Sequence, residues 1–161
     1  TGTTDDQPDP RDGRADIDRV AVFMRYLAPP NRAPGSPDAQ AGQQLFATLN
    51  CAACHHPAYR TGVNPVAALS EKNVVLYSDL LLHDMGALGD GIAQADAGPR
   101  EMRTAPLWGL RVRPAFLHDG RAMTLDAAIR AHDGEAAVSR DAYTQLTTGE
   151  QRQLLAFLNT L

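Results

Sequence analysis

The sequence predicts an all-α fold with long loops and room for a short β-hairpin. Apolar residues recur at helical spacing in several segments, and no part of the chain alternates strands with helices as a βαβ fold requires. Hydrophobic residues make up 43% of the 161 residues, which is enough for a buried core. A chain of this length favours one main domain with an appended segment.

The first 36 residues are predicted to be an arm, an amphipathic helix and a linker, and the main domain covers residues 37–161. Residues 1–15 hold almost no apolar side chain and are predicted to be a mobile, solvated arm. A helical apolar stripe follows Asp16, and we expect its Met24 to be a core residue. The chain starts at Thr1 rather than at a methionine, so we expect it to be processed or truncated.

A second helix is predicted to begin at Ser36, because a serine cap followed by proline is a common helix start. Gly42 lies one turn before Phe46 on the same face, where a glycine costs about 1 kcal/mol relative to alanine. Close approach by another helix would explain that cost. We expect Phe157, in the last predicted helix, to be the partner of this face.

The middle of the chain is predicted to be mostly irregular. Residues 56–73 carry turn signals, and residues 74–77 are a short β-prone run. Residues 86–104 are rich in glycine and are predicted to form a long loop. A loop of that length inside a compact domain is usually functional.

Helices are predicted again near the end of the chain. The first is capped by Thr124 and reaches about His132, and a second short helix starts at a Ser139 cap. The last begins with Thr147 and Glu150, which form a capping-box pattern.

Two cysteines three positions apart, followed at once by a histidine, form the motif Cys51-Ala52-Ala53-Cys54-His55. This is the attachment pattern of a c-type haem. Each thiol adds to one of two vinyl groups on adjacent pyrroles, and the short spacing presents both sulfurs to one edge of the porphyrin. His55 can then give the iron an axial nitrogen. The motif therefore predicts one covalent haem c.

Other uses of the motif fit the sequence less well. A structural zinc site needs further ligands at suitable spacing, and the chain has only 2 cysteines. A redox-active dithiol normally lies at the start of a helix in a βαβ unit. A disulfide across so short a loop would be strained.

The stretch 100–121 is rich in arginine and holds the single tryptophan, Trp108. One hypothesis is that Arg103 and Arg111, with the indole N–H of Trp108, bind the haem propionates, because bidentate arginine suits carboxylates. The alternative is a solvated basic surface.

Several longer motifs resemble known proteins. AGQQLF at 41–46 and LLAFL at 154–158 resemble the first and last helices of the cytochrome c fold, which cross beside the haem. The whole pattern resembles the C-terminal half of a bacterial di-haem family, labelled thiol-oxidoreductase-like and related to di-haem cytochrome c peroxidases. The segments that carry this resemblance are the haem motif, DIDR at 16–19, YSDLLLHDMG at 77–86, RTAPLWGL at 103–110 and LHDGR at 117–121. The resemblance implies a cytochrome c-like helical domain around one covalent haem. The family's N-terminal half, with its other haem, is expected to lie outside this sequence.

The second axial ligand stays open on spacing alone, because His132, Met85 and Met123 could each reach the iron. In the resembling peroxidases, the distal methionine of the electron-transfer haem lies at the end of the helix after the His-Asp-Gly turn. His132 occupies that place here. We therefore predict His55 and His132 as the iron ligands, with Met85 and Met123 as alternatives.

The leading function hypothesis is electron transfer, by a mono-haem carrier or by the electron-transfer subunit of a larger redox assembly, with a redox partner protein. The alternative is a peroxidase-like or thiol-oxidising enzyme, for which His83 and Asp84 could supply acid–base chemistry. A docking subunit with a redox-silent haem is a third hypothesis. We assign no catalytic residue, because a His132 ligand would block the iron.

Composition bears on partners and location. A net charge of -4 argues against nucleic acid as the main partner. No apolar run approaches the length of a membrane span. Covalent haem is attached outside the bacterial cytoplasm, so we expect a periplasmic or extracytoplasmic location.

Overall fold

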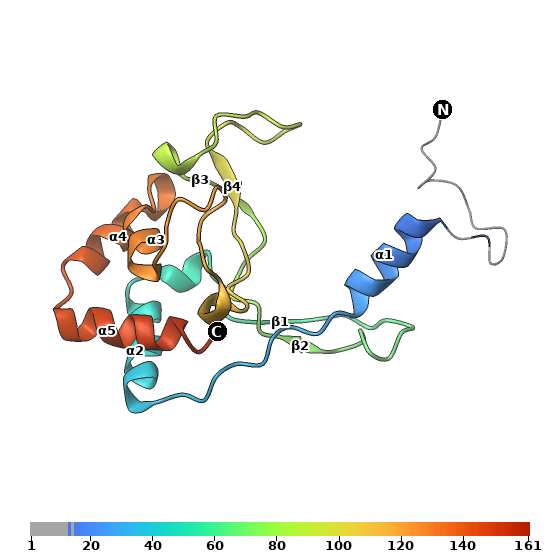
Figure 1. Cartoon of the computed structure of the whole chain (residues 1–161), viewed down its shortest axis with the longest axis horizontal. Helices are drawn as coiled ribbons and strands as arrows, with labels where there is room; N and C mark the ends of the chain where they lie inside the picture. Colours follow the sequence, from blue (N-terminus) through green and yellow to red (C-terminus); the bar gives the residue numbers. More distant parts are fainter. Residues whose placement is uncertain (1–12, 14) are drawn as a thin grey trace. The chain divides into compact units, whose positions relative to one another are not determined.

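A computed structural model describes residues 13 and 15–161, so the arm predicted for residues 1–15 lies almost wholly outside the described residues. The chain divides into two compact units, Thr1–Pro30 and Asn31–Leu161 (Figure 1).

The first unit contains helix α1 (Asp16–Tyr26). The carboxylate of Asp18 accepts a hydrogen bond of 3.1 Å from the main-chain N–H of Ala15, which satisfies one of the free donors at the start of the helix. No residue of α1 is buried, and Met24 is 60% exposed. The expectation that Met24 is a core residue was therefore wrong, because the apolar stripe packs against no surface among the described residues of its own unit.

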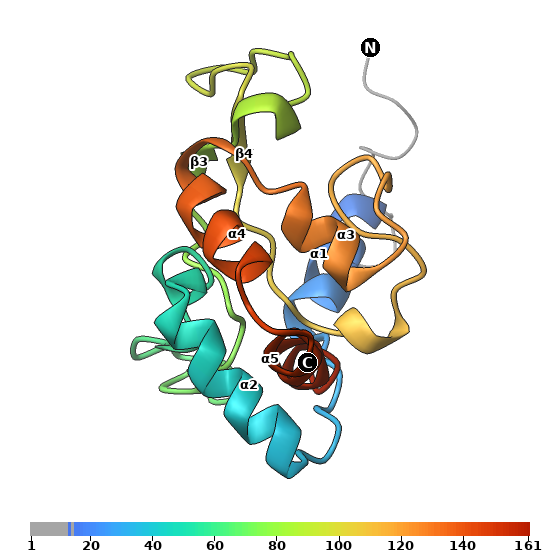
Figure 2. The same ribbon diagram turned by 90° about the vertical axis from the view of Figure 1, so that its left-hand side faces the viewer.

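The core of the second unit is the crossing of α2 (Pro37–Thr48) and α5 (Thr148–Leu158). Figure 2 shows α5 nearly end-on where it passes α2. A side chain on Gly42 would collide with the main chain of Gln153 in α5, and the rings of Phe46 and Phe157 pack edge to face with centroids 5.4 Å apart. The predicted contact of the Gly42/Phe46 face with Phe157 is confirmed.

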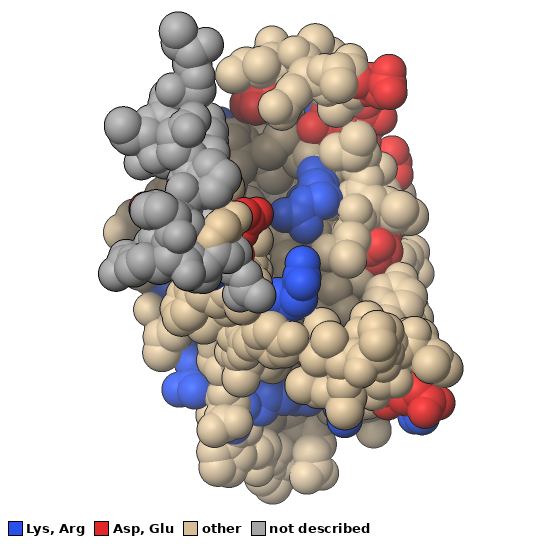
Figure 3. All heavy atoms as spheres, turned by 90° about the vertical axis from the view of Figure 1, so that its right-hand side faces the viewer, with Lys and Arg blue, Asp and Glu red and all other residues tan. Residues whose placement is uncertain are grey.

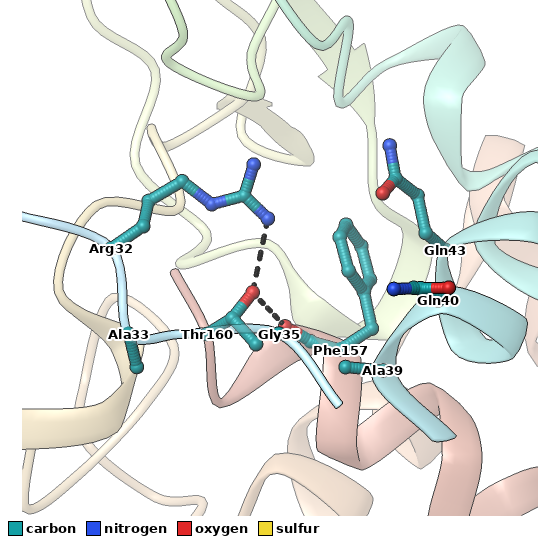
Figure 4. Close-up of a pocket in the computed structure, with 8 residues that line it drawn as sticks. All are labelled: Arg32, Ala33, Gly35, Ala39, Gln40, Gln43, Phe157 and Thr160. Atoms are coloured by element: carbon teal, nitrogen blue, oxygen red, sulfur yellow. Dashed lines mark hydrogen bonds between the residues drawn. The ribbon is translucent and has the colours of Figure 1, made fainter. Parts of the chain in front are cut away.

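The chain that leads into α2 is fastened to the end of α5 (Figure 4). The N–H of Ala33 donates to the carbonyl of Thr160 at 2.9 Å, and the Arg32 guanidinium donates to the Thr160 hydroxyl at 3.0 Å. The same guanidinium lies 5.8 Å from the centroid of the Phe157 ring. These contacts border a small open pocket of about 140 Å³ beside the helix crossing.

Two shorter helices, α3 (Leu125–Arg130) and α4 (Ala137–Thr144), complete the helical part. The predicted cap is confirmed in α3, where the Thr124 hydroxyl accepts from the N–H of Ala127 at 3.0 Å. The Ser139 cap was wrong. The cap of helix α4 is Ala136, three residues earlier, because the 3-10 turn η5 (Gly134–Ala136) leads directly into the helix.

Two small antiparallel sheets make the fold mixed α/β, so the all-α prediction was wrong. Strand β1 (Tyr59–Arg60) pairs with β2 (Asn73–Val74), and β3 (Leu82–Asp84) pairs with β4 (Glu101–Arg103). The second pairing falls partly in the predicted long loop 86–104 and joins the two ends of that segment. Strands of 2 or 3 residues are too short to show the alternation by which a strand is recognised.

The 3-10 turns η2 (Cys51–Ala53), η3 (Gly86–Leu88) and η4 (Leu110–Val112) connect these elements. Within the described part of the chain, no helix has the length and apolar character that crossing a membrane requires. Figure 3 shows both basic and acidic side chains among uncharged atoms on the described part of one face.

Candidate functional site

The C-x-x-C-H motif starts where α2 ends. Asn50 takes a left-handed conformation, with φ of 62°, which turns the chain out of α2 and into η2. Asparagine tolerates this conformation better than most residues do. The turn presents Cys51, Cys54 and His55 on one short loop, and both thiols are free and partly buried.

A distant segment lies along this loop and holds it through main-chain hydrogen bonds. The bonds run from Tyr77 N to Pro57 O at 3.3 Å, from Ser78 N to His56 O at 3.0 Å and from Asp79 N to Cys54 O at 2.8 Å. Ser78 is fully buried, and its hydroxyl donates to the carbonyl of Thr104 at 2.7 Å. The motif loop is therefore fixed by residues 77–79 as well as by α2.

This segment also orients His55. Tyr77 has φ of 52°, and its carbonyl accepts a hydrogen bond of 3.1 Å from Nδ1 of His55. A ring that donates through Nδ1 keeps Nε2 unprotonated and available as a ligand, which is the usual arrangement of a metal-binding histidine.

His132 faces His55, and a hydrogen bond from its Nδ1 to a main-chain carbonyl orients its ring in the same way. The centroids of the two rings lie 6.4 Å apart, and the Nδ1 of His132 donates to the carbonyl of Ala128 at 2.8 Å. Burial lowers the pKa of His55 to about 4, and burial also lowers the pKa of His132. Both imidazoles are therefore neutral near pH 7, as metal ligands must be.

The separation of the two rings suits a shared metal ion. A bond between a metal and an imidazole nitrogen is about 2 Å long, so two histidines that bind one ion from opposite sides hold their ring centroids roughly 6 Å apart. The structure thus brings His55 and His132 to a spacing that fits an iron between them. Met123, by contrast, is 68% exposed on the wall of a cavity of about 620 Å³, and Met85 immediately precedes η3.

Beside the motif loop lies a polar cluster that the sequence analysis did not assemble. Nε2 of His83 lies 2.8 Å from a carboxylate oxygen of Asp79, and its Nδ1 lies 2.8 Å from a carboxylate oxygen of Glu135. Hydrogen bonds to Glu135 and then to Asp79 raise the pKa of His83. Cys54 is close by, with its Sγ 3.8 Å from Nδ1 of His83.

The comparisons with known proteins identify the family. Residues 4–161 match the family described as "Di-haem oxidoreductase, putative peroxidase". The chain belongs to this family. Haem-dependent redox chemistry is therefore the general function of the family, and haem is its cofactor.

A search of curated proteins found no match. Among solved structures, a chain from Kuenenia stuttgartiensis hydrazine synthase pressurized with xenon has a similar fold, with a TM-score of 0.64 and 18% identity. The match covers 94% of the present chain and 57% of the hydrazine synthase chain. At this identity the likeness shows the fold alone.

The thiols of this di-haem oxidoreductase family member lie in an environment that disfavours thiolates. Burial raises the pKa of Cys51 to about 11. Burial, followed by the charges of Asp79 and Glu135, raises the pKa of Cys54 as well. Reactive dithiols have lowered pKa values, so these thiols do not resemble a redox-active pair.

Two of the residues predicted to bind propionates donate to main-chain carbonyls instead. The indole N–H of Trp108 donates to the carbonyl of Val75 at 2.6 Å, and Arg111 donates to the carbonyl of Asn31 at 2.8 Å. Arg103 is exposed in β4. A propionate role would require Trp108 and Arg111 to exchange these main-chain acceptors for a carboxylate.

Proposed function

We propose that this chain is an electron-transfer unit that holds one c-type haem, with thioether bonds to Cys51 and Cys54 and with His55 and His132 as axial ligands. The observation that carries the proposal is the facing pair of neutral imidazoles, each of which donates its Nδ1–H to a main-chain carbonyl. We further propose that it acts outside the cytoplasm and exchanges electrons with a protein partner, alone or inside a larger redox assembly.

When bound, haem supplies an iron that cycles between two oxidation states. The chain's own residues set the conditions for that cycle. The carbonyls of Tyr77 and Ala128 fix the tautomer and direction of the two rings, so both can serve as nitrogen ligands in either oxidation state. A methionine ligand raises the potential of a haem, so a pair of histidines favours a lower one.

The propionate contacts form part of the same proposal. Arg111 and Arg113 line the cavity of about 620 Å³, whose other walls include Leu110, Phe116 and Leu125. Guanidinium groups beside apolar side chains suit a porphyrin edge that ends in carboxylates, although Thr124, Asp126 and Asn159 also line this cavity. Trp108, Arg103 and Arg111 keep the role predicted for them here.

A peroxidase-type enzyme is the second candidate, favoured by the description of the family. Such an enzyme needs a free position on its iron for the peroxide. His83 is not suited to act as a free base in that reaction, because both of its ring nitrogens are bonded to carboxylates.

Optical and electron paramagnetic resonance spectra of the haem-loaded ferric protein, followed by addition of hydrogen peroxide, separate the two candidates. Electron transfer predicts a six-coordinate, low-spin iron that reacts slowly with peroxide. A high-spin iron with rapid peroxide turnover would establish the peroxidase and overturn the proposal. Fractionation of cells that express the natural gene tests the location, which the proposal places outside the cytoplasm.

A further inference from the structure

The side chain of His83 connects the two sides of the candidate site. Its partner Asp79 belongs to the segment that holds the motif loop, since the N–H of Asp79 donates to the carbonyl of Cys54. Its other partner, Glu135, lies three residues after His132. The His83 side chain is only 16% exposed and that of Asp79 is 9% exposed, so the Asp79 half of the connection is shielded from water, whereas the Glu135 side chain is 55% exposed.

Several other contacts hold the segment after His132 against the segment after His83. The carboxylate of Glu135 accepts from the N–H of Asp84 at 2.9 Å, and that of Asp133 accepts from the N–H of Ala87 at 3.0 Å. A side chain on Gly134 would collide with the main chain of Asp84, so the two segments lie in direct contact. On the far side, Arg140 donates to the carbonyl of His132 at 2.8 Å.

We propose that His83 is a positioning residue that holds His132 over His55 by tying Asp79, on the motif side, to Glu135, on the side of the distal ligand. The inference rests on the proposed coordination and names the part of the chain that maintains it. His83 touches neither axial ligand through a hydrogen bond, and it acts through the segments that carry them. Loss of the connection lets the segment 132–135 move, so His132 leaves the iron more often.

A histidine suits this task because its rigid ring presents two N–H donors in nearly opposite directions. Glutamine can bond to one of the two carboxylates but cannot span both. A metal ion is the competing explanation of the cluster, since the ligand atoms of Cys54, Asp79 and His83 lie within 4.8 Å of one another. The hydrogen-bonded explanation fits better, because both ring nitrogens of His83 already lie at hydrogen-bond distance from a carboxylate.

The test is the rate at which cyanide binds to the haem-loaded ferric protein. In a six-coordinate iron, cyanide must wait for His132 to dissociate, so the rate reports how often the ligand leaves. We expect His83→Gln to raise the rate at least tenfold, with a high-spin fraction that the wild type lacks. Glu135→Ala should do the same from the other end of the connection. Glu71→Ala is the matched control, because it removes a carboxylate from the exposed Arg60 pair of the same unit and should leave the rate unchanged.

Unchanged cyanide rates in a folded His83→Gln protein would overturn the inference. If that variant does not fold, unchanged rates in Glu135→Ala overturn the inference, since this change removes the bond to His83 together with the one from the N–H of Asp84. The His132→Ala variant separates this failure from failure of the proposed function. If His132→Ala keeps the low-spin spectrum, the proposed coordination by His132 is overturned. If His132→Ala loses the low-spin spectrum while His83→Gln binds cyanide at the wild-type rate, only the role of His83 is overturned.

Discussion

Gly42 of α2 lies directly against the main-chain carbonyl of Gln153 in α5, with no space for a side chain between them. Alanine at this position would gain about 1 kcal/mol of helix propensity, but overpacking against a backbone typically costs about 1–3 kcal/mol. We therefore expect Gly42→Ala to lower the free energy of unfolding by about 1 kcal/mol and Gly42→Leu by about 3 kcal/mol. Chemical denaturation of the haem-loaded protein measures both values.

Gly35→Ala is the control for this pair. Gly35 has no positive φ, and a side chain there would meet no atom within 4 Å, so the change should be within about 0.5 kcal/mol. Equal stability of the Gly42→Leu variant and the wild type would contradict the close helix contact.

Covalent attachment predicts that acid–acetone extraction leaves the haem with the protein. The double variant Cys51→Ser with Cys54→Ser should release all of its haem, because no thioether can form. Each single variant should keep one thioether and retain the colour. Extraction of free haem from the wild type would show that the cofactor is not of c type.

Replacement of the distal ligand predicts a change of spin state. His132→Ala should make the ferric iron high-spin, because the ring that lies 6.4 Å from that of His55 is removed. The wild type should lack the near-infrared band of a histidine–methionine haem. The matched control, His118→Ala, removes an exposed histidine and should leave the spectrum unchanged. A normal spectrum in His132→Ala, with its loss in Met85→Ala or Met123→Ala, would move the ligand to that methionine.

The contribution of His83 to stability should depend on pH. Hydrogen bonds to Glu135 and Asp79 raise its pKa, so the charged ring is favoured in the folded state. That stabilisation is fully present below the ordinary histidine value of about 6.5 and disappears as the pH rises through the raised pKa. The stabilisation is also lost as the pH falls from the ordinary glutamate value of about 4.3 through the pKa of Glu135, which the hydrogen bond from His83 lowers.

The difference in melting temperature between the wild type and His83→Gln measures this effect. We expect the difference to be largest near pH 5–6 and much smaller at pH 9. A difference that stays constant, or that grows toward pH 9, would mean that the ring is not charged in the folded protein.

The elements that the sequence predicted correctly are those whose signals act within a few residues. Ser36, Thr124 and Thr147 each accept the expected hydrogen bond from a main-chain N–H three positions later. The glycine in α2 could be interpreted because a helix has a fixed period, so Gly42 and Phe46 had to share a face.

The parts that the sequence did not predict depend on residues far apart in the chain. The hydrogen bonds from residues 77–79 to the motif loop involve the main chain, which leaves no pattern in side chains. His83 meets one carboxylate 4 positions away and another 52 positions away, and no local spacing indicates the second. The pairing of β3 with β4 was missed for the same reason, because contacts between segments, rather than strand propensity, fix such short strands.

Helix α1 has a consequence for how the stability of the chain is measured. It has 11 residues and buries none of them, and isolated helices shorter than about 12–15 residues are marginal in water. Its amide hydrogens should therefore exchange with solvent through local opening, orders of magnitude faster than those at the crossing of α2 and α5. We therefore expect a single melting curve to report mainly the unfolding of residues 31–161, which contain the α2–α5 crossing.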